Sequence, residues 1–87
     1  MSETEQTLRL KRLQYRSMHR GCKETDLILG EFSRIHLPKL RAEELDAFEA
    51  LLDEDDVDIW NWLVEKTATP ALYQALVPTM RAIKLPI

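Results

Sequence analysis

One short stretch of the chain places a cation and an anion on either side of a glycine. It reads Arg20-Gly21-Cys22-Lys23-Glu24 and lies between two segments of strong helical character. Gly21 predicts an elbow between two helices, because glycine adopts positive φ without steric cost. Arg20 and Glu24 then lie beside an open corner, where they can make charge-assisted hydrogen bonds to another molecule. On these five residues alone a structural explanation is stronger, since each charge also suits the dipole of its own helix.

The surroundings of this stretch change the interpretation. It lies within Tyr15–Leu27, and further along the chain come Phe48–Asp53 and Asp56–Leu63. Together these segments resemble the small succinate dehydrogenase assembly factors that promote flavinylation of the flavoprotein subunit. The resemblance extends over nearly the whole chain, from about Leu8 to Leu85.

The hallmark of that family is the pattern R-G-x-x-E. Arg20, Gly21 and Glu24 match it, and Asp26 stands where many members also have an aspartate. One departure is His19, at a position where many members have a second arginine. The pattern is common by itself, but its place before a helix and ahead of the acidic, tryptophan-containing segment makes the resemblance more specific.

The resemblance implies a binding module and not an enzyme. Such a chain binds the flavoprotein subunit of succinate dehydrogenase, or of the related fumarate reductase, before the iron–sulfur subunit docks. It favours covalent attachment of FAD to a histidine of that subunit, so the FAD belongs to the partner and this chain binds no cofactor directly. The partner-binding residues implied here are Arg20, Gly21, Glu24, Asp26, Arg16 and Tyr15.

An arginine stripe offers an alternative function. Its members are Arg9, Arg12, Arg16 and Arg20, which recur along one side of the first predicted helix. Such a stripe can follow phosphates, as in a small antitoxin-like or nucleic-acid-associated regulator. The formal net charge of −3 opposes this interpretation, and an acidic protein surface satisfies the same stripe. We therefore expect no nucleic acid, and a generic helical adaptor is the third hypothesis.

Charges of opposite sign are separated along the chain. Residues 9–23 carry only basic charges, whereas residues 43–58 carry only acidic ones. This separation predicts a dipolar molecule. Two explanations stay open: the two regions neutralise each other within the fold, or the dipole steers a protein partner.

The sequence lacks the patterns of a metal site or a catalytic centre. His19 and His36 are too far apart to chelate zinc as a helical pair. The acidic run from Asp53 to Asp58 lacks the glycine and the final glutamate of a calcium-binding EF-hand loop. No phosphate-binding loop, dinucleotide fingerprint or nucleophile elbow occurs. We predict no catalytic or metal-ligating residue.

Three further features concern the cellular environment. The single cysteine, Cys22, excludes an intramolecular disulfide and favours a reducing compartment. No stretch reaches the ~18–20 apolar residues that cross a bilayer, so no membrane insertion is expected. Residues 1–7 are polar and acidic, unlike a targeting segment, which predicts a cytoplasmic location and a bacterial-type family member. We expect the free chain to be a monomer.

The elements that must position these residues are helices. Hydrophobic periodicity is helical almost throughout, and strand signals are nearly absent. The predicted helices cover about 7–19, 23–36, 42–53 and 56–66, and a fifth follows Thr69-Pro70, with Pro78 kinking or interrupting it. The fold class is therefore all-α, a compact bundle of about five short helices. It forms a single domain over residues 1–87 whose ends, 1–6 and 85–87, fray.

The core faces follow from the same periodicity. Gly30 allows close approach of a neighbouring helix, and the side chains of Trp60 and Trp62 point roughly 200° apart, so only one of them belongs to the core. The predicted core residues lie three or four positions apart: Ile28, Phe32 and Ile35, flanked by Leu27 and Leu29; Leu45, Phe48 and Leu52; Ile59, Trp60 and Leu63; and Leu72, Leu76 and Met80.

Overall fold

The computed structural model describes residues 3–83. Within this range the chain forms α-helices and short 3-10 helices and no strand, which confirms the predicted all-α bundle. The elements in chain order are α1 (Glu3–Met18), α2 (Lys23–His36), η1 (Leu37–Lys39), α3 (Ala42–Leu52), α4 (Asp56–Leu63), η2 (Ala71–Tyr73) and α5 (Val77–Arg81).

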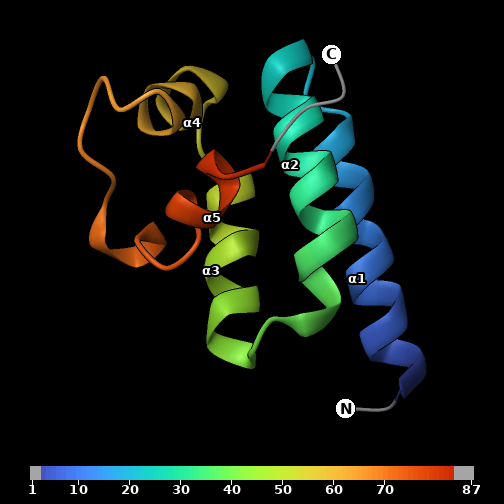
Figure 1. Cartoon of the computed structure of the whole chain (residues 1–87). Helices are drawn as coiled ribbons and strands as arrows, with labels where there is room; N and C mark the ends of the chain where they lie inside the picture. Colours follow the sequence, from blue (N-terminus) through green and yellow to red (C-terminus); the bar gives the residue numbers. More distant parts are fainter. Residues whose placement is uncertain (1–2, 84–87) are drawn as a thin grey trace.

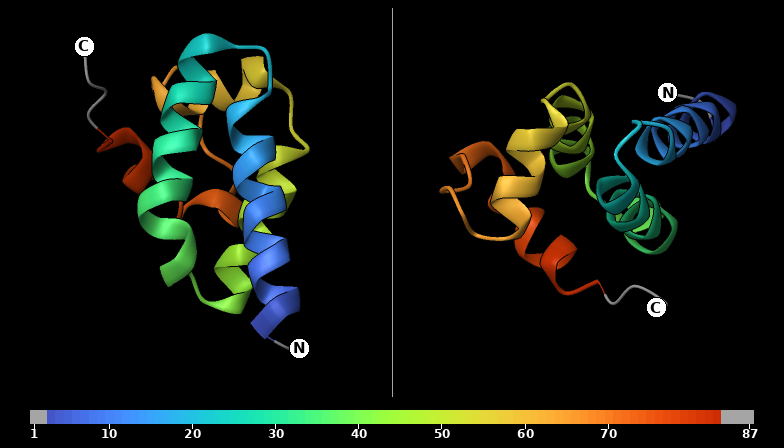
Figure 2. Two further views of the ribbon diagram at one scale, coloured as in Figure 1. Left: turned by 90° about the vertical axis from the view of Figure 1, so that its right-hand side faces the viewer. Right: turned by 90° about the horizontal axis from the view of Figure 1, so that it is seen from above.

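The helices pack in two groups. α1 and α2 form an antiparallel hairpin, and α3, α4 and α5 pack against one side of it (Figures 1 and 2). The elbow between α1 and α2 lies at the same end of the molecule as the turn between α3 and α4 (Figure 1). Segments more than thirty residues apart in sequence therefore meet at this end.

Aromatic side chains join the two groups in the core. Phe32 of α2 and Phe48 of α3 are fully buried, with ring centroids 5.3 Å apart. Trp62 of α4 and Tyr73 of η2 form a second pair at 5.3 Å. Pairs at this separation stabilise a core beyond the burial of their area. Trp62 is thus the core tryptophan, while Trp60 is only half-buried.

The helix boundaries differ from the predicted ones in two places at the start and middle of the chain. α1 begins at Glu3 and not near Thr7, so residues 3–6 belong to the helix, while residues 1–2 and 85–87 lie outside the described range. α4 ends at Leu63 and not at Lys66, because the backbone at Glu65 turns to a positive φ of 61°.

The fifth predicted helix is wrong as a single element. A 3-10 turn at residues 71–73 precedes α5, which begins only at Val77. Pro78 lies in the first turn of α5, where its missing N–H group is not needed, so it starts this helix and does not kink it. Leu72, predicted for the core, is exposed because the tighter turn directs Tyr73 inward in its place.

The buried face of α2 is also rotated from the predicted one. Leu29 and Phe32 lie at its centre, whereas Ile28 and Ile35 are half-buried and Leu27 is 45% exposed. The remaining predicted core residues are buried: Leu45, Phe48, Leu52, Ile59, Leu63, Leu76 and Met80.

Candidate functional site

Arg20 ties the elbow to the turn between α3 and α4. Its Nη1 and Nη2 donate to the carbonyl oxygens of Leu52 at 2.6 Å and Glu54 at 2.5 Å, and its Nε donates to Oδ1 of Asp56 at 2.6 Å. The carbonyl of Leu52 ends α3, where helical acceptors lack partners of their own, the carbonyl of Glu54 lies in the turn that follows, and Asp56 lies in the first turn of α4. The guanidinium thus satisfies three acceptors in one small region.

The structure places the Arg20 side chain against its own chain, at a position where the sequence predicted contact with a partner. All three of its side-chain nitrogen atoms are engaged within the chain, and the side chain is only 11% exposed. The structure therefore uses three of the five N–H donors of the Arg20 guanidinium within the chain. These contacts join residues more than thirty positions apart, so they could not be read from the sequence around the motif.

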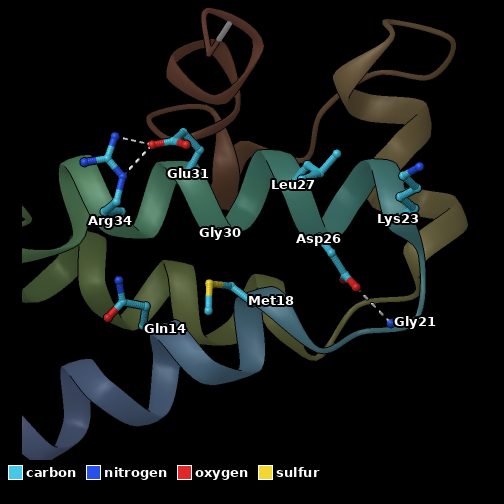
Figure 3. A pocket seen from close by; sticks show the side chains of 9 residues that line it. All are labelled: Gln14, Met18, Gly21, Lys23, Asp26, Leu27, Gly30, Glu31 and Arg34. Atoms are coloured by element: carbon cyan, nitrogen blue, oxygen red, sulfur yellow. Dashed lines mark hydrogen bonds and ion pairs between the residues drawn. The ribbon is translucent and has the colours of Figure 1, made fainter. Parts of the chain in front are cut away.

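Asp26 fixes the backbone of the elbow. Its Oδ1 accepts the N–H of Arg20 at 3.0 Å, and its Oδ2 accepts the N–H of Gly21 at 3.2 Å. Figure 3 shows the carboxylate of Asp26 pointing from α2 back toward Gly21. Both carboxylate oxygens therefore bind the chain's own backbone, although the sequence predicted contact with a partner.

Gly21 and Glu24 form the accessible part of the motif. Gly21 has a φ of 96°, which confirms the predicted elbow, and a Cβ added there would meet nothing within 4 Å. The backbone conformation requires glycine, while the space outside it stays open. Glu24 is exposed in the first turn of α2, and its Oε2 lies 3.8 Å from the thiol of Cys22, a long contact.

Tyr15 and Arg16 lie on the same end of α1. Tyr15 is 65% exposed and packs its ring on His19 at a centroid distance of 4.0 Å. Arg16 is half-exposed and donates from Nη2 to Oδ1 of Asp53 at 2.6 Å. Of the predicted site residues, the structure thus leaves Tyr15, Gly21 and Glu24 accessible and partly engages Arg16.

The arginine stripe is largely paired with the acidic part of the chain. Nη2 of Arg9 lies 2.7 Å from Asp46 and 3.0 Å from Glu49, both on α3. The hydrogen bond to Asp46, followed by that to Glu49, raises the pKa of Arg9 above its ordinary value. The other pairs are Arg16–Asp53 and Arg20–Asp56. The two charged regions thus neutralise each other within the fold to a large extent. Most arginines of the stripe are therefore already paired and are not available to bind phosphates.

A groove between α1 and α2 adjoins the elbow. Its volume is about 550 Å³, and Met18 and Leu27 are 47% and 45% exposed along it (Figure 3). Gly30 makes the close approach possible, since a Cβ there would lie 2.8 Å from Cγ of Met18. The predicted role of Gly30 in helix approach is therefore confirmed.

A second hollow lies on the other side of the elbow, and we call it the α4 notch. It has a volume of about 320 Å³ and is lined by Cys22, Glu24, Asp56, Val57 and Trp60. Val57 is 69% exposed although it is β-branched and apolar. Val57 was not among the predicted site residues, although its place between Asp56 and Asp58, off the core face of the fourth helix, is a signal in the sequence that could have found it.

Two findings limit other kinds of site in the described part of the chain. None of its helices has both the length and the apolar character to cross a membrane. Between residues 3 and 83, no three or more histidine, cysteine or acidic side chains gather in a way that could hold a metal ion.

The chain is similar to known proteins of one family. A family model described as "Flavinator of succinate dehydrogenase" matches residues 11–84. The protein "Succinate dehydrogenase assembly factor 2, mitochondrial" of Cryptococcus neoformans var. neoformans is 49% identical over 72 residues, covering 83% of this chain and 41% of the relative. Proteins of the same name are 37% identical over 67 residues in Dictyostelium discoideum and 43% identical over 70 residues in Mycosarcoma maydis. They cover 77% and 80% of this chain, which spans 48% and 29% of those relatives.

These relatives contradict the cytoplasmic location expected from the sequence. All three are named as mitochondrial proteins, so that expectation is wrong. It depended on the polar character of residues 1–7, and the bacterial-type assignment depended on the same residues. Because the relatives are more than twice as long as the stretch they share with this chain, its first residues carry no information on targeting.

Proposed function

Because this chain belongs to the family of flavinators of succinate dehydrogenase, we propose that it binds the flavoprotein subunit of that enzyme and promotes its covalent attachment to FAD. The observation that supports the site is the open elbow. Gly21 and Glu24 are exposed there, and half-exposed apolar side chains flank them on both sides. Exposed apolar side chains around an accessible charge are typical of a protein-binding surface.

The motif divides into a supporting part and a contacting part. Arg20 and Asp26 hold the elbow in place through hydrogen bonds within the chain. Gly21, Glu24 and Tyr15 contact the flavoprotein, with Arg16 at the edge of the contact. Gly21 allows close backbone approach, and Glu24 accepts charge-assisted hydrogen bonds from the partner.

The chain acts by selecting a conformation of its partner. Covalent attachment of FAD to a histidine is carried out by the flavoprotein, which also holds the FAD. A binding factor accelerates that reaction when it binds the attachment-competent domain arrangement more tightly than the open one. A preference of about 100-fold changes the ratio of the two arrangements by the same factor. No catalytic residue of this chain is needed for such a mechanism.

Co-expression with the flavoprotein subunit tests this function. Covalent flavin is measured as in-gel fluorescence after denaturation, with and without this chain. We expect a strong increase with the wild-type chain and a loss with Glu24→Gln, because one charge-assisted hydrogen bond contributes roughly 1.5–3 kcal/mol and thus about tenfold or more in affinity.

Glu43→Gln is the matched control for this experiment. Glu43 is also an exposed glutamate in the first turn of a helix, α3, and its substitution should leave flavinylation unchanged. Equal covalent flavin with and without the wild-type chain would contradict the proposed function. Equal loss from both glutamate variants would contradict the assignment of Glu24 to the contact.

A further inference from the structure

We propose that the α4 notch receives an apolar side chain of the flavoprotein subunit that lies next to a cationic one paired with Glu24. This inference depends on the proposed function and adds the chemistry of the partner segment. The notch is formed by two segments far apart in sequence, the elbow at Cys22 and Glu24 and the first turns of α4.

The apolar half of the proposal comes from Val57 and Trp60. Val57 is the most exposed of the large apolar residues in the described range, at 69%, and the half-buried Trp60 lies one helical turn further along α4. An exposed valine that lines the same hollow as a tryptophan gains burial when a partner covers both. The volume of about 320 Å³ is at the low end of the range of roughly 300–1,000 Å³ for small-molecule pockets, so a single large side chain suits it.

The cationic half comes from the charges around the notch. Asp56 is already paired with Arg20 at 2.6 Å, whereas the structure gives Glu24 no cation among residues 3–83. Lys23 precedes Glu24 but lines the groove on the other side of α2. The rim of the notch therefore keeps an uncompensated negative charge, which an arginine or lysine of the partner can pair with.

A second copy of this chain is a poorer occupant. In a two-fold symmetric contact centred on the notch, each Glu24 would face the acidic rim of the other copy, and like charges in such a contact cost several kcal/mol. The flavoprotein is favoured because the notch is continuous with the elbow that carries Gly21 and Glu24.

Binding of the purified, FAD-loaded flavoprotein subunit to the full chain tests the proposal. We expect Val57→Ala to weaken the affinity by roughly tenfold, the size expected for two lost buried methyl groups. Glu24→Gln should weaken it by a similar factor and reduce its dependence on salt, because an exposed ion pair is screened. Leu72→Ala and Glu43→Gln are the matched controls, since both residues are exposed at other sites, and each should change the affinity less than twofold.

Alkylation of Cys22 gives a second measurement on the unchanged chain. It is the single cysteine, it is partly exposed and it lines the notch, so a bound flavoprotein should slow its alkylation, followed by mass spectrometry. Because this measurement uses the wild-type chain, it tests the notch even if Val57→Ala or Glu24→Gln fails to fold.

The outcomes separate the two proposals. Absence of any binding by the wild-type chain removes the proposed function and this inference together. Wild-type binding with unchanged affinity in Val57→Ala and unprotected Cys22 overturns the inference alone. A change of self-association in Val57→Ala without a change in flavoprotein binding assigns the notch to a second copy and also overturns it.

Discussion

Replacing Arg20 by alanine should destabilise the fold strongly, although Arg20 belongs to a motif associated with partner binding. The substitution removes the three donors that bind Leu52, Glu54 and Asp56. It leaves one carbonyl oxygen at the end of α3, one in the turn after it and one carboxylate at the start of α4 without their partner. The elbow then loses its connection to the second group of helices.

The magnitude follows from these contacts. A hydrogen bond to a charged group contributes about 1.5–3 kcal/mol when buried, but the freed carbonyls can bind water at this partly exposed turn. We therefore expect the free energy of unfolding to fall by about 2–4 kcal/mol. Small domains have a total of about 5–15 kcal/mol, and each kcal/mol changes the Tm by about 4–8 °C, so the Tm should fall by about 10–30 °C.

Urea unfolding followed by circular dichroism and tryptophan fluorescence measures this change. Arg12→Ala is the control, because Arg12 is exposed on α1, the helix that leads into the elbow, and no ion pair is seen for it in the described range; its effect should stay within about 0.5 kcal/mol. Arg20→Lys should fall between the two, since a lysine keeps the charge but cannot reach three acceptors in the same way. Equal stability of Arg20→Ala and Arg12→Ala would refute the structural role of Arg20.

Three other predictions concern stability alone. Gly21→Ala should cost about 1–2 kcal/mol in urea unfolding, because the φ of 96° disfavours any residue with a Cβ, and an effect near zero would contradict it. Gly30→Ala should cost about 1 kcal/mol or more through its contact with Met18, and combining it with Met18→Ala should remove most of that cost; simple additivity in the double variant would contradict the contact. Burial, and then the hydrogen bond to Glu54, raise the pKa of Tyr73 from 10.0 to about 12, so its stabilising effect is complete below pH 10 and is lost as the pH rises to 12. Urea unfolding between pH 9 and 12 should therefore show a smaller loss in Tyr73→Phe than in the wild type, and identical losses would contradict this.

Helix positions could largely be predicted from the sequence because they depend on local patterns. The second and third helices were located correctly from apolar spacing and from the residues at their ends. The last helix could not be located, because Pro78 is compatible with either a kink or a helix start, and only the packing of Tyr73 and Val77 decides between them.

The site could be predicted only in part for a related physical reason. The elbow at Gly21 could be predicted from the sequence, because the ability of glycine to adopt positive φ does not depend on tertiary contacts. The partners of Arg20 lie 32 to 36 residues away along the chain. The sequence does not show that the elbow packs against the turn between α3 and α4, so these partners could not be predicted. The exposure of Val57 likewise depends on how α4 is rotated against the core.

The internal role of Arg20 changes what a functional assay of the motif can show. If the chain acts as proposed, a loss of flavinylation in Arg20→Ala should arise through the geometry of the elbow, and lowering the expression temperature should restore part of the activity as the fold recovers. Under the proposed function, a loss in Glu24→Gln arises at the contact with the flavoprotein, so it should persist at every temperature while the free energy of unfolding stays near that of the wild type. Measuring both variants at two temperatures therefore separates the part of the motif that builds the surface from the part that uses it.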